Sequence, residues 1–366
     1  MRLLQLRLHQ FRSYKQLTVM PPDGITVFVG ENGAGKTNLL EAIHLCCLGR
    51  SHRTGTDRDM IQIGEKTCAV HARVQRKNAQ DEVGVRLFSQ QGERKRIYVN
   101  GKVVQRIGEL MGHMTCVMFS PEDLELAKGS PQVRRGFLDM LLSQSQAAYF
   151  YVIQTYASIL RQRNTLLKDI ARGRNDEKQL DVWDEQLAKA AAPIVRHRRE
   201  AALAISELAK AHYQFISGRD REHFFLSYQS TLEDSMDPEH DLAAQLAASR
   251  KEDIRRLSTG PGPHRDDLKL MLAGQDMRSY SSQGQARTAA LAMRLAQIDI
   301  LSSAHQETPL LLLDDVLSEL DAGRRARLLI RLDRMQTLLT CTDMSGIKEL
   351  QPSCILQVSD GTIKSE

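Results

Sequence analysis

The stretch that decides the fold reads ITVFVGENGAGKTNLLEAI, residues 25–43. Its opening ITVFV is β-branched or aromatic throughout and predicts a short buried strand. Residues 30–37 then match the phosphate-binding pattern G-x-x-x-x-G-K-[ST] in full, and residues 37–47 have helical character. A strand, this loop and a helix in that order are the context in which the pattern binds a nucleotide. The sequence therefore predicts an α/β nucleotide-binding core.

Different residues of this loop have different tasks. Glycines let successive backbone N–H groups turn towards phosphate oxygens. Lys36 adds a positive charge at the β- and γ-phosphates, and the Thr37 hydroxyl is a ligand for Mg²⁺. ATP and Mg²⁺ are therefore the expected cofactors. We expect the nucleotide to contact the whole loop: Gly30, Glu31, Asn32, Gly33, Ala34, Gly35, Lys36, Thr37 and Asn38.

A second motif, LLLLDD at residues 310–315, places two carboxylates after four apolar residues. The apolar run predicts a strand buried on both faces, whose C-terminal end is where α/β proteins bind ligands. We predict that Asp314 holds Mg²⁺ and that Asp315 orients or deprotonates the attacking water. Acidic residues end many strands, so the motif gains its meaning from the phosphate loop. The candidate catalytic residues are Asp315, Asp314 and Lys36.

A third motif, SSQGQ at residues 281–285, opens a predicted helix. A serine hydroxyl, a glycine amide and a helix N-terminus together form an anion site suited to a γ-phosphate. Taken alone, the motif indicates only a helix cap, but its position between the other two motifs favours the anion site. Its residues Ser282, Gly284 and Gln285 resemble the signature motif of the ABC-type ATPases, with Gln283 where those proteins commonly carry glycine.

That resemblance has consequences for assembly and turnover. SELD, residues 318–321, follows the acidic strand as the D-loop does in that family. The family architecture implies that Ser282 of one copy faces Lys36 of another, so ATP would close a homodimer. Three departures are visible: Asp315 stands where a glutamate is usual, no switch histidine follows the late strand, and no Q-loop glutamine is evident near Ser120. The shorter side chain at 315 predicts slow hydrolysis.

The chain as a whole predicts a split nucleotide domain. Residues 1–120 alternate short strands and include the hairpin signal Asn100-Gly101. Residues 121–258 are mainly helix-forming and predict an inserted helical arm, with Pro193 expected to kink its long helix. Residues 259–366 return to strand–helix alternation. In the terms of the resemblance, the fold class is an α/β ABC-type ATPase head, with mixed β-sheets around a parallel P-loop core.

Composition adds few constraints. The formal charge of +5 and pI of 8.8 suit a polyanionic partner but are also ordinary. The six cysteines form no CxxC pair, so we expect reduced, buried thiols and no zinc site. The opening residues lack the continuous apolar run of a secretory signal, and no stretch is long enough to cross a bilayer. We therefore expect a cytoplasmic protein.

Candidate DNA contacts lie in the basic segment after the phosphate-loop helix. Arg50 and Arg53 are the first candidates, with pairing to Asp57 or Asp59 as the alternative. No base-reading motif is present, so contacts should be to phosphate and should weaken with salt. Basic residues of the arm helices are further candidates, although charge runs on helices are usually solvated faces: Arg161, Arg163, Lys168, Arg172, Arg174, Arg196, Arg198 and Arg199. Arg265 is either a nucleotide sensor or a partner for a neighbouring aspartate.

Beyond the ATPase motifs, the chain resembles the RecF family of bacterial recombination mediators, which are related to the heads of SMC proteins. The resemblance runs nearly end to end through FRSY (11–14), GRSHRT (49–54), PEDL (121–124) and GPHRDD (262–267). It implies a weak, DNA-dependent ATPase switch that binds gaps and junctions between single- and double-stranded DNA. It also implies partnership with RecR, and indirectly RecO and RecA, in repair, replication restart and the SOS response.

Two other classes of protein remain as alternatives. A transport motor of the ABC class would dock on membrane partners and act without DNA, but the missing switch histidine and the arm argue against it. A purely structural SMC-like tether would need long heptad repeats, which the arm does not sustain.

Overall fold

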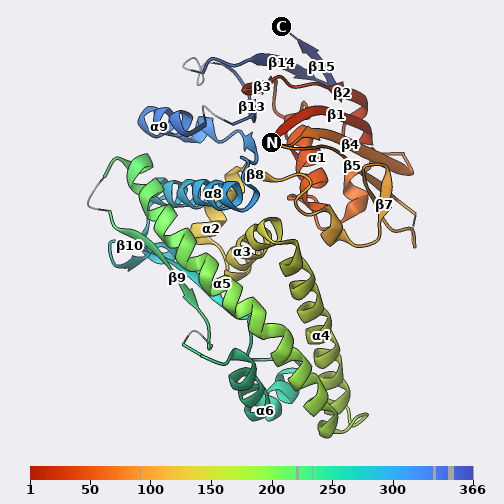
Figure 1. The fold of residues 1–366 in the computed structure, drawn as a ribbon, viewed down its shortest axis with the longest axis vertical. Helices are drawn as coiled ribbons and strands as arrows, with labels where there is room; N and C mark the ends of the chain where they lie inside the picture. Colours follow the sequence, from red (N-terminus) through yellow and green to blue (C-terminus); the bar gives the residue numbers. More distant parts are fainter. Residues whose placement is uncertain (91, 220–221, 233, 333–334, 345–349, 366) are drawn as a thin grey trace. The chain divides into compact units, whose positions relative to one another are not determined.

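The computed structural model describes residues 1–366 except 91, 220–221, 233, 333–334, 345–349 and 366. The chain divides into two compact units (Figure 1). One contains residues 1–123, 215–218 and 290–366 and is called the ATPase unit below. The other contains residues 124–214 and 219–289 and is called the arm unit.

A six-stranded sheet forms the base of the ATPase unit. Its order is β15 (Thr362–Ser365), β14 (Cys354–Ser359), β3 (Ile25–Val29), β13 (Thr337–Cys341), β12 (Leu310–Asp314) and β8 (Cys116–Phe119). All neighbours are parallel except β14 and β15. Every residue of β12 and β13 is buried, as expected for central parallel strands. The parallel P-loop core predicted from the sequence is confirmed.

A second, antiparallel sheet completes this unit. Its order is β2 (Tyr14–Val19), β1 (Arg2–Phe11), β4 (Thr67–Gln75), β5 (Gln80–Phe88), β6 (Arg96–Val99) and β7 (Lys102–Val104). Asn100 and Gly101 have positive φ angles of 51° and 77°, which is the type I′ turn predicted between β6 and β7. Helix α1 (Lys36–Leu48) contacts strands of both sheets, which explains why it is buried nearly all round.

Further helical elements of this unit lie between its strands or follow them. They are η1 (Asp57–Met60), η2 (Ile107–Leu110), η3 (Pro121–Asp123), η5 (Leu317–Glu319) and α9 (Ala322–Leu332). Within the ATPase unit, α9 holds the last turn of the long helix that enters from the arm: Arg327 donates to the carbonyl of Ile216 at 2.9 Å, and the Arg331 guanidinium lies 4.8 Å from the Phe215 ring centre.

The arm unit is mainly helical. Its helices are α2 (Leu124–Lys128), α3 (Pro131–Ser145), α4 (Ala147–Ala171), η4 (Glu177–Gln179), α5 (Leu180–Ser217), α6 (Pro238–Arg256), α7 (Met277–Tyr280) and the start of α8 (Gln283–His305). Helix α5 has 38 residues and continues through Pro193. Asp237 caps α6 as predicted, because its carboxylate accepts from the His240 amide at 3.2 Å.

A small sheet places the second division of the chain later than the predicted residue 259. Strand β10 (Asp267–Leu272) pairs along its whole length with β9 (Phe224–Gln229), and β11 (Gln275–Asp276) follows it. Residues 259–289 therefore lie in the arm unit, and the chain re-enters the ATPase unit at Ala290, within α8. The Gly/Pro-rich turn at 260–263 only brings the chain back to β9.

Candidate functional site

A polar cavity of about 330 Å³ lies at the C-terminal edge of the parallel sheet. Its walls combine the phosphate loop, the end of β12 and the end of β13, all within the ATPase unit. The residues that line it are Asn32, Gly33, Gly35, Lys36, Thr37, Asn38, Arg53, Asp314, Asp315 and Thr340. The structure thus brings together most of the predicted phosphate-loop residues and both predicted carboxylates.

The glycines of the loop are required by its shape. Gly35 has a φ of 106°, and a Cβ there would lie 2.6 Å from the Ser13 hydroxyl oxygen. At Gly30 a Cβ would lie 2.3 Å from the carbonyl oxygen of Val358. The buried Lys36 ammonium donates to the carbonyls of Gly30 at 2.6 Å and Glu31 at 2.9 Å. A phosphate arriving in the loop would offer this cation a stronger, charged acceptor.

Thr37 and Asp314 fit a Mg²⁺ ion. The Thr37 hydroxyl donates to Asp314 Oδ1 at 2.9 Å. Adjacent ligands of octahedral Mg²⁺ lie about 2.9 Å apart when each metal–oxygen bond is about 2.0–2.1 Å, so these two oxygens have the right separation. Among the described residues no group of three His, Cys, Asp or Glu side chains is placed to hold a metal. Phosphates and water would therefore supply the remaining ligands.

Thr340 holds the Asp314 carboxylate and the Asp315 backbone in place, and it was not predicted from the sequence. Its hydroxyl donates to Asp314 Oδ1 at 2.7 Å and accepts from the Asp315 amide at 3.0 Å. The parallel register of β12 and β13 places Thr340 directly beside Asp314. A polar residue at the end of the neighbouring strand was the signal that identifies such a partner.

Asp315 is held in an unfavourable state. Its φ is 50°, in the left-handed region that non-glycine residues rarely adopt. One of its carboxylate oxygens, Oδ1, is buried without a hydrogen-bond partner. Buried polar atoms normally have a hydrogen-bond partner. An unpaired acceptor on a residue that lines the cavity therefore indicates a site for a hydrogen-bond donor. A water molecule beside a bound nucleotide would be such a donor.

A buried carboxylate, Glu41, organises the basic segment beside the cavity. It accepts two hydrogen bonds from Arg12, at 2.7 and 2.8 Å, and one from Ser51 at 2.5 Å. Burial alone would raise the pKa of Glu41, but the hydrogen bonds from Arg12 and Ser51 hold it below its usual value. Arg53 lies 3.7 Å from the same carboxylate and donates to Asn38 at 3.1 Å.

The two predicted DNA contacts are consequently in different places. Arg53 lines the nucleotide cavity, where it adds positive charge near the phosphate loop. Arg50 is exposed and is not part of the cavity lining, and its backbone carbonyl contacts His44 Nδ1 at 3.1 Å. Arg50 therefore stays a candidate DNA contact outside the cavity lining.

The signature residues lie in the arm unit, where they form a reciprocal cap on α8. The Gln285 amide donates to the Ser282 hydroxyl oxygen at 3.2 Å, and the Ser282 amide donates to Gln285 Oε1 at 3.0 Å. Gly284 lies in the first turn of the helix, and its carbonyl accepts from Thr288 at 2.8 Å. The cap uses the Ser282 oxygen only as an acceptor, so its hydroxyl hydrogen can be donated to an anion.

Glu222 fixes the signature glutamine from outside the motif. Its carboxylate accepts from the Gln285 side-chain amide at 3.1 Å and from the Tyr213 hydroxyl at 2.7 Å. Burial would raise the pKa of Glu222, but these hydrogen bonds lower it, so the carboxylate stays charged. Because Tyr213 belongs to α5, the signature is tied to the long arm helix. No sequence pattern near residue 222 announces this role.

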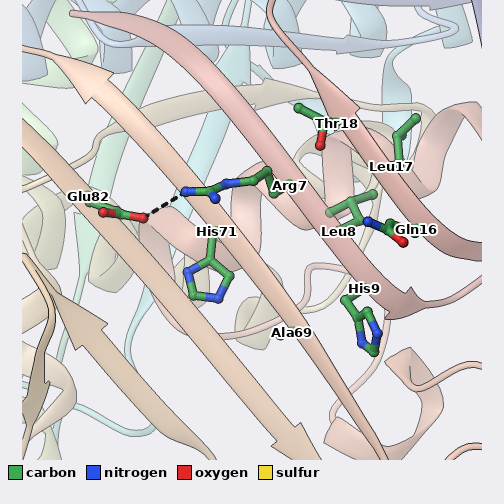
Figure 2. A pocket seen from close by; sticks show the side chains of 9 residues that line it. All are labelled: Arg7, Leu8, His9, Gln16, Leu17, Thr18, Ala69, His71 and Glu82. Carbon is green, nitrogen blue, oxygen red and sulfur yellow. Dashed lines mark hydrogen bonds and ion pairs between the residues drawn. The ribbon is translucent and has the colours of Figure 1, made fainter.

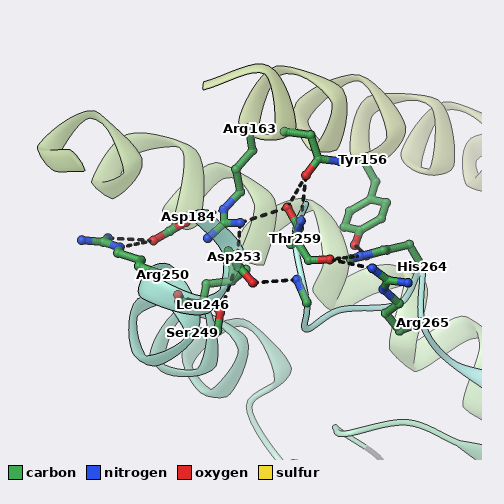
Figure 3. A network of polar contacts seen from close by, with 12 residues as sticks. Tyr156, Arg163, Asp184, Leu246, Ser249, Arg250, Asp253, Thr259, His264 and Arg265 are labelled. Carbon is green, nitrogen blue, oxygen red and sulfur yellow. Dashed lines mark hydrogen bonds and ion pairs between the residues drawn. The ribbon is translucent and has the colours of Figure 1, made fainter. Parts of the chain in front are cut away.

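Two of the arm arginines are structural, so for them both interpretations, a solvated helix face and a DNA contact, were wrong. Arg163 is fully buried and pairs with Asp184 at 2.7 Å and Asp253 at 2.8 Å (Figure 3). Arg198 is also buried and pairs with Asp139 at 2.9 Å. Arg199 is half-buried and donates to backbone carbonyls. The exposed members of the set are Arg161, Lys168, Arg172, Arg174 and Arg196.

Arg265 does not pair with a neighbouring aspartate. It donates to the Thr259 carbonyl at 3.2 Å, beside His264 (Figure 3). Asp266 instead accepts from the Tyr228 hydroxyl, and Asp267 pairs with Arg134 at 2.7 Å. Burial lowers the pKa of His264 to about 4, so this histidine is neutral in the folded arm at neutral pH.

Comparisons with known proteins agree with this geometry. The family model described as the RecF/RecN/SMC N terminal domain matches residues 2–359. The DNA replication and repair protein RecF of Shouchella clausii is 40% identical over 368 residues, covering 98% of each chain. The protein of the same name from Symbiobacterium thermophilum is 42% identical, covering 95% of this chain and 93% of its own.

Solved structures give the same result. A structure of the recombination mediator protein RecF with ATPrS superposes with a TM-score of 0.92 at 33% identity, covering 99% of this chain and 97% of that one. An SMC head bound to the C-winged helix domain of ScpA has a TM-score of 0.57 at 17% identity and shares the fold alone.

The fold and the cavity define an ATPase head of the ABC type, in the class shared by RecF, RecN and SMC proteins. Within that class, the chain belongs to the RecF family. In the part of the chain that the structure describes, none of the helices combines the length and apolarity needed to span a membrane.

Proposed function

We propose that this chain is an ATP-dependent DNA-binding protein of recombinational repair and replication restart. In this proposal ATP closes a homodimer on gaps and on junctions between single- and double-stranded DNA, and slow hydrolysis releases it. The observation that carries the proposal is the cavity in which Lys36, Thr37 and Asp314 meet. Relatives named as DNA replication and repair proteins, and related structures determined with ATP and ATPrS, support it.

The cavity residues suit a nucleotide triphosphate. Lys36 would exchange two backbone carbonyls for phosphate oxygens, and the loop amides would satisfy others. Mg²⁺, when bound by Thr37 and Asp314, would neutralise charge on the β- and γ-phosphates. Asp315 would orient a water, or take its proton, through its unpartnered oxygen. Its short side chain and strained backbone favour a slow ATPase that acts as a timer.

Closing the site requires a second copy. The signature lies in the arm unit, and its Ser282 hydroxyl can donate to the γ-phosphate of ATP bound by a partner. DNA contacts would involve phosphates and the exposed Arg50. Partnership with RecR, and through it with RecO and the loading of RecA, follows from the family and from the RecFOR pathway in which the related structures were placed.

The test is binding to gapped DNA, measured by fluorescence anisotropy with and without ATP over a range of salt. The proposal expects ATP to tighten binding and salt to weaken it steeply, because phosphate contacts release counterions. ATP hydrolysis that DNA does not change would favour a transport motor. DNA binding that ignores ATP would favour a passive tether. Either result contradicts the proposal.

A change at Glu222 tests the role of the signature separately. Replacing Glu222 by alanine frees the Gln285 side chain on one side, so we expect ATP-dependent dimerisation and ATP turnover to fall roughly 10- to 150-fold, the equivalent of one lost hydrogen bond to a charged group. ATP binding to the monomer should not change, because the phosphate loop lies in the other unit. Sedimentation and a phosphate-release assay measure the two effects. Glu207→Ala, at an exposed position of α5, is the control; equal behaviour of the two variants would remove Glu222 from the mechanism.

A further inference from the structure

The outer face of the antiparallel sheet carries a basic cluster that the nucleotide site does not use. Alternate residues of β1, β4, β5 and β6 point to the core and are buried, while their neighbours form this outer sheet face. Its charged members, apart from histidines, include four arginines and one carboxylate in the middle of the sheet: Arg7, Arg73, Arg86, Arg96 and Glu82. The surface is therefore positive.

The positions of two of these arginines destabilise the sheet. Arg86 on β5 and Arg96 on β6 are direct cross-strand partners. Among the described residues neither lies within ion-pair distance of a carboxylate; their guanidinium groups instead lie 5.5 and 5.3 Å from the centre of the Phe88 ring. Like charges directly opposite each other destabilise a strand pair. A bound polyanion would remove that repulsion.

A hollow beside this pair gives the outer sheet face its shape. It has a volume of about 340 Å³ and is lined mainly by β1, β2 and β4, with Arg7, His9 and His71 on its walls (Figure 2). Ala69 lines the hollow and is the cross-strand partner of Arg86. His71, which also lines it, is paired with Gly84, and Gly84 is paired in turn with Tyr98 on β6. Among the described residues Glu82 is the one carboxylate on its wall; it pairs with Arg7 at 3.2 Å, and both side chains are about half-exposed. This pair can open to a phosphate at little cost.

The chemistry of the surface selects its occupant. Guanidinium groups bind phosphates and stack on bases, and the partly exposed Tyr98 offers a further stacking surface. The faces of the bases are accessible in a single strand and hidden in a duplex. From β1 to β6 the sheet extends about 14 Å, which is enough for a short run of nucleotides. We propose that the outer sheet face binds the unpaired strand of DNA, an inference that rests on the proposed DNA-repair function.

The test is the affinity for a fluorescent oligothymidylate, measured by anisotropy at several salt concentrations. The double variant Arg86→Glu/Arg96→Glu should bind at least 10-fold more weakly than the unmodified protein. For a milder second variant, Arg86→Gln/Arg96→Gln, the slope of log affinity against log salt should fall by about 1.4, because two phosphate contacts are lost. ATP affinity should stay the same, since neither residue lines the nucleotide cavity.

The matched control is Lys102→Glu/Lys364→Glu, which reverses the same number of charges. Both lysines are exposed, Lys102 on β7 and Lys364 on β15, and neither belongs to the outer sheet face. The single variant Arg86→Glu places a carboxylate opposite Arg96, so its melting temperature should be retained or raised while its binding falls. Loss of binding in a stable variant excludes unfolding as the cause.

The possible results distinguish failure of this inference from failure of the proposed function. Equal weakening by the arginine and lysine variants overturns the inference and leaves the proposed function standing. Weaker duplex binding with unchanged single-strand binding also overturns it. If the arginine variants keep their oligonucleotide affinity but lose binding to RecR, the face docks a protein and the inference fails. An unmodified protein that binds no DNA in any nucleotide state overturns the proposed function itself.

Discussion

Replacing Lys36 by alanine is expected to lower ATP affinity on the order of 100-fold, because each hydrogen bond to a charged group contributes about 1.5–3 kcal/mol. The ammonium is buried in the phosphate loop and already spends two hydrogen bonds on backbone carbonyls. Among the described residues Lys36 is the one lysine that lines the cavity, so none of the others described can take its place. Titration with a fluorescent ATP analogue measures the loss.

The same variant should no longer dimerise when ATP is added. Lys66→Ala removes an exposed lysine outside the cavity and is expected to retain both ATP binding and dimerisation. Circular dichroism would show whether the Lys36 variant remains folded. Unchanged sedimentation behaviour in ATP, in a variant with the predicted loss of affinity, would separate dimer formation from nucleotide binding and contradict the proposed switch.

The second large effect is expected at Arg163. Its fully buried guanidinium joins three helices, through Asp184 on α5 and Asp253 on α6, and also donates to Thr259 at 2.9 Å (Figure 3). Arg163→Met leaves buried carboxylates without their cation, which costs about 3–5 kcal/mol in unfolding free energy. Urea unfolding of the arm should move to lower denaturant, while ATP binding in the other unit is retained.

Two further variants make this result specific. Arg161→Met changes an exposed arginine one half-turn earlier on α4 and should leave stability within about 0.5 kcal/mol. Adding Asp253→Asn to Arg163→Met removes one stranded charge, so part of the lost stability should return. A variant at Arg163 as stable as the one at Arg161 would show that the ion pairs contribute nothing, and would reopen the arm arginines as DNA contacts.

Local sequence predicted the nucleotide core well. The strand β3 coincides with ITVFV, helix α1 begins within the phosphate motif, and β12 delivers Asp314 to the cavity as expected. These elements are specified by neighbouring residues: β-branched runs, glycines with positive φ, and apolar residues before a carboxylate. The chemistry of the site could therefore be predicted from contiguous motifs.

What the sequence did not reveal depends on partners far apart along the chain. Thr340 meets Asp314 through strand register, and Glu222 meets Gln285 across 63 positions. The local sequence of Arg163 is typical of a solvated charge on a helix, whereas in the fold its side chain is buried between two aspartates. The local sequence of residues 259–289 did not place them in the arm unit for the same reason, because β10 is defined by its pairing with β9.

The conformation of Asp315 has a consequence for how this chain can change. Asparagine and glycine adopt the left-handed backbone conformation more easily than aspartate. Neither would bury a charged oxygen without a hydrogen-bond partner. Selection for thermal stability alone would therefore replace Asp315 by one of these residues. The ATPase unit is therefore less stable than the same unit with asparagine or glycine at position 315 would be. This loss of stability arises at a single residue that lines the nucleotide cavity.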